Sequence, residues 1–241
     1  LLLLFAGAPL AFATGVMATI MIMGEFGQNG LSLIATRIYD MVADYAFVAV
    51  PMFVMMGLVL ERSGVTTDLF RALSILGHRI RGGLALQTLV VSVLLASMSG
   101  IIGGEIVLLG LIALPEMLKR GYDKKLAIGT ICAGGSLGTM IPPSIVLIVY
   151  GLTTDTGVGD LFLAVLVPGL MLASFYAIYI YILATIKPTV APFLNPQELN
   201  ISSTEKNRII INSLLPIAVA AWVLICIYSG IASIVEAAAM G

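Results

Sequence analysis

An apolar segment between Leu126 and Tyr150 contains the interruption that most constrains how this chain can fold. The interruption runs from Gly134 to Ser144 and reads GGSLGTMIPPS, with three glycines and two adjacent prolines. Relative to alanine, a glycine costs a helix about 1 kcal/mol and a proline about 3 kcal/mol. Pro143 also forces the residue before it away from helical backbone angles. The sequence therefore predicts a discontinuous helix over 126–150.

The apolar character of the whole chain places this interruption inside a membrane. Apolar residues make up 60% of the sequence and charged residues only 10%, with a mean hydropathy of +1.10, whereas soluble domains carry about 25% charged residues. The fold class that we expect is an all-α integral membrane protein with several spans. Hydrocarbon tolerates broken backbone only where protein buries it or where it lines a polar cavity. The interruption is then either a proline kink packed against a neighbouring helix or an ion or substrate site, and the clustered glycines and prolines favour the site.

A second apolar stretch, 84–114, is interrupted between Ser97 and Gly104. Its first limb, 84–96, would be about 20 Å long as a helix, which is too short to cross a membrane. Basic residues lie on both sides of the stretch: Arg79, Arg81, Lys119, Arg120, Lys124 and Lys125. Short loops rich in lysine and arginine stay in the cytoplasm. These flanks favour a re-entrant helical hairpin over the alternative, a single tilted span that breaks the charge rule.

The chain divides into three predicted parts. Residues 1–83 form scaffold spans and, at 61–81, an amphipathic arm helix that lies in the membrane plane. Residues 84–160 contain the hairpin and the broken helix. Residues 161–241 form further spans. Both ends of the chain are apolar, so we expect a fragment of a longer protein.

The two interruptions are the places where polar groups gather at membrane depth. Serine and threonine hydroxyls and unpaired backbone carbonyls are the oxygen ligands that bind Na⁺ in transporters. The N-termini of half-helices attract the anionic groups of a substrate. Together, these features predict a site that binds a cation and an anion close to each other. Glu105, at the start of the second hairpin limb, has two interpretations. It binds the coupling cation or a proton, or it pairs with freed N–H groups near the tip. The structural role is favoured, because a carboxylate repels an anionic substrate.

Other classes of function find little support in the sequence. A serine nucleophile at Ser99 needs a base within hydrogen-bond reach, and the one histidine, His78, lies in a basic polar connection. No cluster of Cys, His and Asp suggests a metal enzyme, and no P-loop suggests an ATPase. A net charge of −1 provides no basic surface for nucleic acid. We therefore expect a protein that is not an enzyme, needs no cofactor and binds no nucleic acid.

Several motifs resemble a known family in both their residues and their order. They are GAPLAFA from Gly7, PMFVMMGLVLERSG from Pro51, RGGLA from Arg81, Ser99-Gly100, IALPEMLKRGYD from Ile112 and AGGSLGTMIPPS from Ala133. In this order they resemble the N-terminal half of the large membrane subunit of tripartite ATP-independent periplasmic (TRAP) transporters, within the ion-transporter superfamily. The resemblance implies Na⁺-coupled secondary uptake, by an elevator mechanism, of an organic acid anion that a periplasmic substrate-binding protein delivers. It also implies one half of an inverted-repeat fold, a small membrane subunit as partner, contact with membrane lipid, and a multi-pass location in a bacterial inner membrane.

The resemblance also implies a set of site residues. Those expected to bind sodium are Ser97, Ser99, Gly100, Gly134, Gly135, Gly138 and Thr139, and those expected to bind substrate are Ser99, Gly103, Pro142, Pro143 and Ser144. Three departures stand out. The chain stops about where the family's second, inverted half begins, so 84–160 would be one half of the transport domain and 161–241 would end in the start of a truncated second half. Ser233-Ile234-Val235 replaces the common Thr-Pro-Thr, and Ile101, Ile102 and Glu105 replace small hydroxyl residues. The last departure leaves the substrate class open. The alternative functions are a binding-protein-independent anion/Na⁺ symporter of the same superfamily and, with least support, a membrane-embedded hydrolase.

Overall fold

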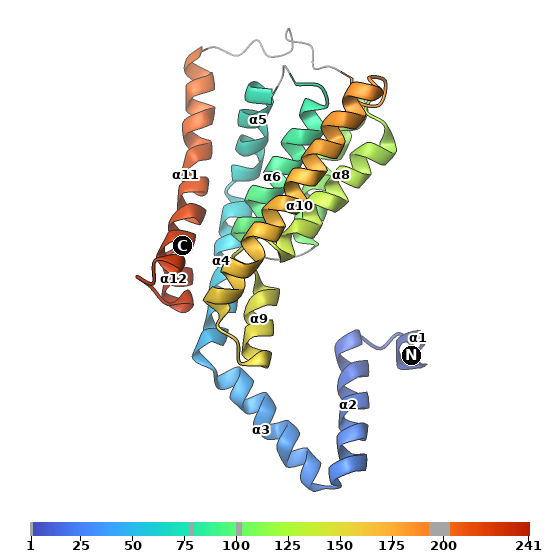
Figure 1. Cartoon of the computed structure of the whole chain (residues 1–241), viewed down its shortest axis with the longest axis vertical. Helices are drawn as coiled ribbons and strands as arrows, with labels where there is room; N and C mark the ends of the chain where they lie inside the picture. Colours follow the sequence, from blue (N-terminus) through green and yellow to red (C-terminus); the bar gives the residue numbers. More distant parts are fainter. Residues whose placement is uncertain (1, 78–79, 100–102, 193–202) are drawn as a thin grey trace. The chain divides into compact units, whose positions relative to one another are not determined.

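The computed structural model describes residues 2–77, 80–99, 103–192 and 203–241, which form helices and no strands (Figure 1). The α-helices are α1 (Leu2–Phe5), α2 (Leu10–Phe26), α3 (Asn29–Ala43), α4 (Ala49–Arg62), α5 (Val65–Gly77), α6 (Gly83–Ser99), α7 (Gly104–Lys119), α8 (Lys124–Ser136), α9 (Ile145–Thr154), α10 (Val158–Ile186), α11 (Ser203–Tyr228) and α12 (Ile234–Met240). Two short 3₁₀ helices, η1 (Tyr45–Val48) and η2 (Leu137–Thr139), connect some of them. The prediction of an all-α chain is confirmed over the residues that the structure describes.

Helix α10 is the one described helix that is both long and apolar enough to cross a membrane unaided. It presents large apolar side chains such as Val167, Met171 and Phe175 on its surface, as a helix in contact with lipid would. The pair Asn29–Ala43 and Tyr45–Leu60 passes the same test only when its helices are taken together as one span. Four other apolar helical stretches are only 10–17 residues long. The expectation that the chain crosses the membrane several times therefore remains a prediction.

The chain forms two compact units, Leu1–Phe47 and Val48–Gly241. In the first unit, α2 packs closely on α3, and a Cβ built on Gly30 would lie 2.6 Å from Cγ2 of Ile22. The second unit contains both of the interruptions that the sequence places at the functional site. The divisions predicted at 83/84 and 160/161 remain predictions, as does the membrane-plane position of the arm helix.

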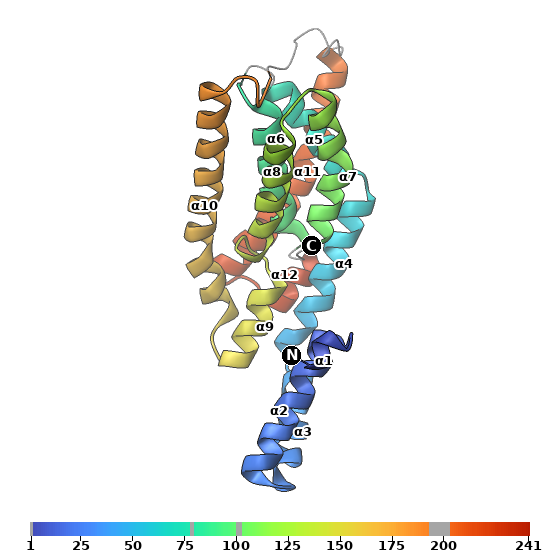
Figure 2. The same cartoon turned by 90° about the vertical axis from the view of Figure 1, so that its right-hand side faces the viewer.

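In the second unit, α6 and α7 form an antiparallel pair that packs on α8 (Figure 2). The start of α6 lies beside the residues that follow α7, because the backbone N–H of Leu84 donates a 3.3 Å hydrogen bond to the Tyr122 hydroxyl. One turn further along α6, the Thr88 hydroxyl lies 3.9 Å from the Met117 sulfur. A cluster of buried apolar side chains fills the space between the three helices and includes Leu89, Leu95, Leu109, Ala113, Ala127 and Ile131. The middle of the predicted hairpin tip (97–104), residues 100–102, lies outside the described residues.

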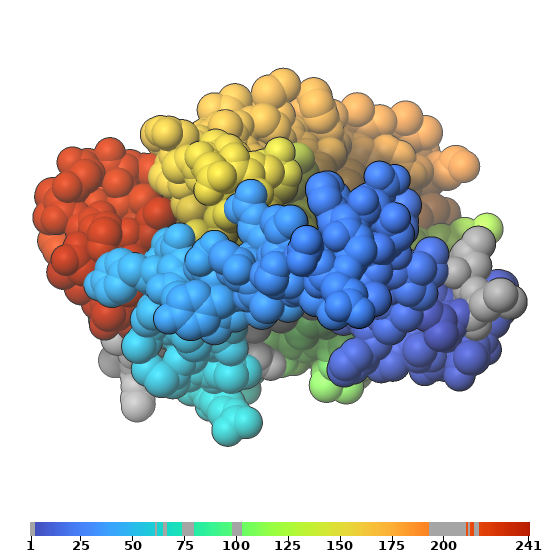
Figure 3. Space-filling model, turned by 90° about the horizontal axis from the view of Figure 1, so that it is seen from below, coloured from blue at the N-terminus to red at the C-terminus, as the bar shows by residue number. Residues whose placement is uncertain are grey.

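A second apolar cluster lies between α4, α9, α10, α11 and α12. Its buried members include Phe53, Ile148, Phe162, Val223 and Ala237. Figure 3 shows α9, in yellow, against the surface of α10, in orange. Helix α8 therefore belongs to one hydrophobic cluster and α9 to the other, and the interruption between them joins the two.

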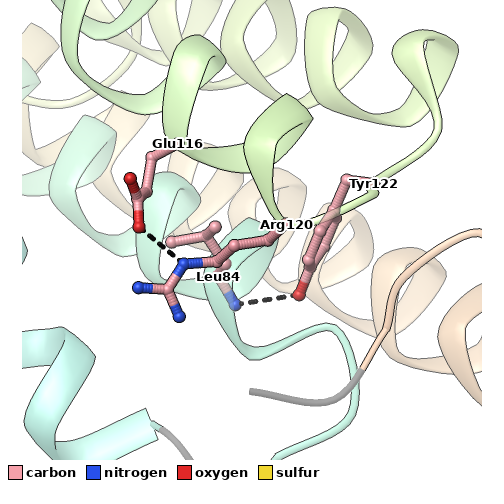
Figure 4. Close-up of polar contacts among 4 residues, drawn as sticks. All are labelled: Leu84, Glu116, Arg120 and Tyr122. Carbon is pink, nitrogen blue, oxygen red and sulfur yellow. Dashed lines mark hydrogen bonds and ion pairs between the residues drawn. The ribbon is translucent and has the colours of Figure 1, made fainter. Parts of the chain in front are cut away.

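Through its hydrogen bond with Leu84, Tyr122 links the segment after α7 to the start of α6 (Figure 4). It lies in the short connection after α7, next to an ion pair in which Arg120 Nε lies 2.6 Å from Glu116 Oε1. Burial raises the pKa of the Tyr122 hydroxyl above its usual value, although the Leu84 hydrogen bond and the Arg120 charge oppose this shift. The hydroxyl therefore stays protonated at neutral pH and accepts the bond from Leu84 as a neutral group.

We expect Tyr122→Phe to destabilise the protein by about 1–3 kcal/mol, because the Leu84 N–H is buried and lies in the first turn of α6, where a helix has no partner of its own to offer. Thermal unfolding of the purified protein in detergent measures the change. Tyr150→Phe, at an exposed position in α9, is the matched control and should leave stability unchanged. Equal unfolding temperatures for the two variants would contradict the structural role of this hydrogen bond.

Candidate functional site

The interrupted segment leaves the α-helical path after Ser136, just past Gly134 and Gly135 in the last turn of α8, and returns to it after its prolines. Helix α8 ends at Ser136, η2 follows, and α9 begins at Ile145. Between them, the peptide bond from Pro142 to Pro143 is cis, and Ser144 has extended backbone angles of φ −123° and ψ 124°. The interruption thus lies at the residues whose propensities most oppose a helix.

The glycines of this segment allow it to approach the helix pair closely. A Cβ built on Gly134 would lie 2.7 Å from Cβ of Ser92 in α6, which is closer than real side chains approach. A Cβ on Gly135 would overlap the Ile106 side chain in α7. Both positions are buried. Close packing therefore explains why these two residues are glycines, and their predicted sodium-binding role stays a prediction.

Gly138 brings a carboxylate to the interruption. A Cβ at this position would lie 3.1 Å from Oε2 and 3.4 Å from Oε1 of Glu105. Glu105 is 4% exposed and lies in the first turn of α7, just after Gly103, which has a φ of +98°. The structure thus adds Glu105 to the residues at the candidate site. Its signal in the sequence was a carboxylate inside an apolar stretch, and the helix dipole at its position favours a negative charge.

The hydroxyl groups near the interruption turn their protons towards their own helices. Thr139 donates to the Ser136 carbonyl at 3.0 Å, and Ser136 donates to the Ala133 carbonyl at 2.7 Å. Ser97, near the end of α6, donates in the same way to the Leu94 carbonyl at 2.7 Å. A hydroxyl whose proton is engaged still has lone pairs that accept. Thr139 and Ser97 can therefore serve as oxygen ligands for a cation.

The far end of the interruption is buried against α10. Pro142, Pro143 and Ser144 are all buried, and Ser144 is 0% exposed. A Cβ on Gly169 of α10 would lie 2.8 Å from the Met140 carbonyl oxygen, so the non-helical backbone packs directly on α10. Among the residues that the structure describes, the Ser144 hydroxyl has no hydrogen-bond partner. Because an unsatisfied buried hydroxyl is costly, this atom is a candidate contact for a bound ligand.

The structure therefore brings some of the predicted residues together and leaves others untested. Gly134, Gly135 and Gly138 contact the helix pair. Ser97 and Gly103 lie near the ends of α6 and α7 that face the predicted tip. Ser99 is the last residue of α6, the position of its side chain is not described, and Gly100 lies outside the described residues. The roles of all these residues in binding remain predictions.

Comparison with known proteins agrees with the sequence resemblance. The family model described as "Tripartite ATP-independent periplasmic transporter, DctM component" matches residues 1–241. A C4-dicarboxylate TRAP transporter large permease protein of Vibrio cholerae is 34% identical over 77% of this chain and 41% of its own length. The corresponding Pseudomonas aeruginosa protein is 36% identical over 67% of this chain and 38% of its own. An ectoine TRAP transporter large permease protein of Halomonas elongata is 32% identical over 98% of this chain and 54% of its own.

The helices of the described residues, the apolar exposed surface of α10 and the buried interruption are features expected of a helical membrane protein. With the match over its full length, the chain belongs to the DctM family, the large permease component of TRAP transporters. It spans about half the length of the curated relatives that it matches.

Proposed function

We propose that this chain forms the part of a TRAP transporter that binds Na⁺ and an organic acid anion between the α6–α7 pair and the interrupted element α8–η2–α9. In the proposal, a periplasmic substrate-binding protein delivers the anion and a small membrane subunit completes the complex in the bacterial inner membrane. The Na⁺ gradient drives uptake, which makes the protein a secondary transporter and not an enzyme. The contact of Gly134, Gly135 and Gly138 with the α6–α7 pair is the observation that carries the proposal, because it puts the start of the second interruption beside Glu105 and Ile106, which directly follow the predicted hairpin tip.

The positions of backbone and hydroxyl oxygens support a sodium site at this contact. Thr139 and Ser97 offer lone pairs, and the turn at η2 offers carbonyl groups of the kind that coordinate Na⁺ at broken helices. The carboxylate of Glu105 adds negative charge beside Gly138, which would favour a cation there. Ser99, Gly100, Gly134 and Gly135 complete the proposed sodium-binding set.

The other end of the interruption supports a substrate site. The buried hydroxyl of Ser144 lies just before α9, and Pro142 and Pro143 directly precede it in the non-helical turn. The N-terminus of α9 carries a positive partial charge that would attract a carboxylate of the substrate. With Ser99 and Gly103 from the helix pair, these residues form the proposed substrate-binding set. Relatives named for C4-dicarboxylate, ectoine and sialic acid make an organic acid the substrate class to test first.

The membrane position of the helix pair follows from charge. Arg81 precedes α6, and Lys119, Lys124 and Lys125 lie between α7 and the first turn of α8. Since both flanks are basic, both should face the cytoplasm, and α6–α7 would be a hairpin that enters and leaves on the same side. In the proposed elevator mechanism, residues 84–160 move against the remaining spans and carry the bound ion and anion across.

The requirement for a binding protein tests this proposal against a related symporter that needs none. The complete complex is reconstituted in proteoliposomes, and uptake of radiolabelled succinate, ectoine and sialic acid is measured with and without the binding protein at a fixed Na⁺ gradient. We expect uptake of one of these compounds, and only when the binding protein is present. Equal uptake without the binding protein would contradict the proposal and favour the binding-protein-independent symporter.

A further inference from the structure

A groove of about 560 Å³ lies between α8 and α10. Helices α8 and α10 lie side by side in both views (Figures 1 and 2). The start of α8 is tied to the segment after α10, because the backbone N–H of Asp123 donates to the Val190 carbonyl at 2.9 Å. The groove therefore runs between two antiparallel helices, with the start of α8 and the end of α10 at the same end.

The lining of the groove is charged at that end and apolar along the rest. Lys125 lies in the first turn of α8, and Lys187 caps the end of α10. Towards the other end, the lining consists of apolar and aromatic side chains such as Leu126, Ile180, Leu183, Tyr176 and Ala133. From Lys125 to Ala133 the helix rises about 12 Å. The groove thus suits a molecule with an anionic head and an apolar tail.

Asp123 is the acidic residue in the groove lining, and its carboxylate is engaged by the helix. Its Oδ1 accepts hydrogen bonds from the backbone N–H groups of Lys125 at 2.8 Å and Leu126 at 3.3 Å. Asp123 therefore acts as the N-cap of α8, and its charge is turned to the helix N-terminus. With two lysines and one aspartate, the charged end of the groove has a net charge of +1.

Thr130 provides an independent sign that the groove holds a ligand. It lines the groove halfway along α8, is 3% exposed, and its hydroxyl has no hydrogen-bond partner among the residues that the structure describes. A buried hydroxyl without a partner destabilises the fold, because it has lost its hydrogen bonds to water. Next to it, a Cβ built on Gly129 would have no other atom within 4 Å, so the wall is open at that point. An acceptor such as an ester carbonyl on a bound molecule would satisfy the Thr130 hydroxyl.

We propose that this groove binds an anionic phospholipid. The phosphate lies between the ammonium groups of Lys125 and Lys187, the ester accepts from Thr130, and one acyl chain follows α10 past Leu183 and Ile180 towards Tyr176. The end of a membrane span is where phospholipid head groups lie, and basic pockets between helices on the cytoplasmic side bind them. The proposal rests on the position of α10 in the membrane and not on the proposed transport function.

Native mass spectrometry of the complete large subunit with its small subunit tests the proposal, with phosphatidylglycerol and phosphatidylcholine titrated separately. Wild-type protein should bind phosphatidylglycerol more tightly than phosphatidylcholine. Lys125→Ala/Lys187→Ala should weaken phosphatidylglycerol binding about 30-fold, since each lysine near an anionic surface contributes about 1 kcal/mol and 1.4 kcal/mol is tenfold. Gly129→Leu should weaken binding of both lipids, because its side chain would occupy the groove.

Two matched variants control for charge and size. Lys119→Ala/Lys124→Ala removes two lysines that do not line the groove, and Gly110→Leu enlarges a glycine of α7 that also has open space around it. Both should bind phosphatidylglycerol as the wild type does. Equal binding of the two lipids by the wild type would overturn the proposal. An unchanged affinity of Lys125→Ala/Lys187→Ala, or an equal loss in the control lysine variant, would also overturn it.

Discussion

Uptake by the complete complex is expected to fall to the background level when external Na⁺ is replaced by choline at constant ionic strength. The proposed site holds a cation and an anion close together, so occupancy by one favours binding of the other. A coupling free energy of about 1–3 kcal/mol corresponds to a 5- to 150-fold change in substrate affinity. Choline is too large for a site built from hydroxyl and backbone oxygens. Initial rates in proteoliposomes measure the effect, and unchanged uptake in choline would remove Na⁺ coupling from the proposed function.

A double variant of the prolines in the interruption tests whether the proposed coupling depends on this segment. Pro142→Ala/Pro143→Ala removes two residues that each cost a helix about 3 kcal/mol, so helical structure can extend into the turn between η2 and α9. We expect the double variant to need more Na⁺ for half-maximal uptake, while its amount in the membrane changes less. Pro115→Ala, at an exposed proline inside α7, is the control. A lower amount of protein with unchanged Na⁺ dependence would assign the prolines a purely architectural role.

Gly134→Ala is expected to destabilise the folded protein by about 1–3 kcal/mol, the usual cost of overpacking a tight contact. The added Cβ would lie 2.7 Å from Cβ of Ser92, and a Cβ cannot rotate away because it is bonded to the backbone. Helices α8 and α6 would have to separate. Unfolding temperature in detergent measures the loss, and Na⁺-dependent uptake should fall with it, because the same contact holds the interrupted element against the α6–α7 pair.

Two further variants separate packing from other effects of alanine. Gly129→Ala lies in the same helix with no other atom within 4 Å of the new Cβ, so the gain in helix propensity should raise stability by up to about 1 kcal/mol. Ser92→Gly should restore part of the stability of Gly134→Ala, because it removes the atom that the new methyl group meets. If Ser92→Gly gives no rescue, the loss in Gly134→Ala arises elsewhere.

Local propensities in the sequence account for the path of the chain at the interruption. Glycine and proline act on their own backbone, so the end of α8 and the start of α9 could be placed from Gly134 to Ser144 alone. The tertiary partners could not be placed in this way. The packing of α8 on α6 and α7 determines that Gly134 lies against Ser92 and that Gly138 lies next to Glu105. No local rule specifies that packing.

Burial of polar groups was also beyond prediction from local sequence. Ser144 was predicted to bind substrate and Thr130 reads as an ordinary small polar residue, but only the structure shows each of them enclosed. Glu105 was recognised as an unusual carboxylate, but its position over η2 depends on the close approach of α7. The structural role that the sequence favoured for Glu105 and the cation-binding role both remain open to the Na⁺ measurements above.

The two hydrophobic clusters of the second unit anchor the helices on either side of the interruption separately. Helix α8 is anchored by Leu126, Ala127 and Ile131 in one cluster, and α9 by Ile148 in the other. Because neither core contains both helices, a small rotation of one against the other would leave the packing of each intact. The strain of such a rotation would concentrate in the few non-helical residues between them, so this turn would act as a hinge in addition to its proposed role in binding.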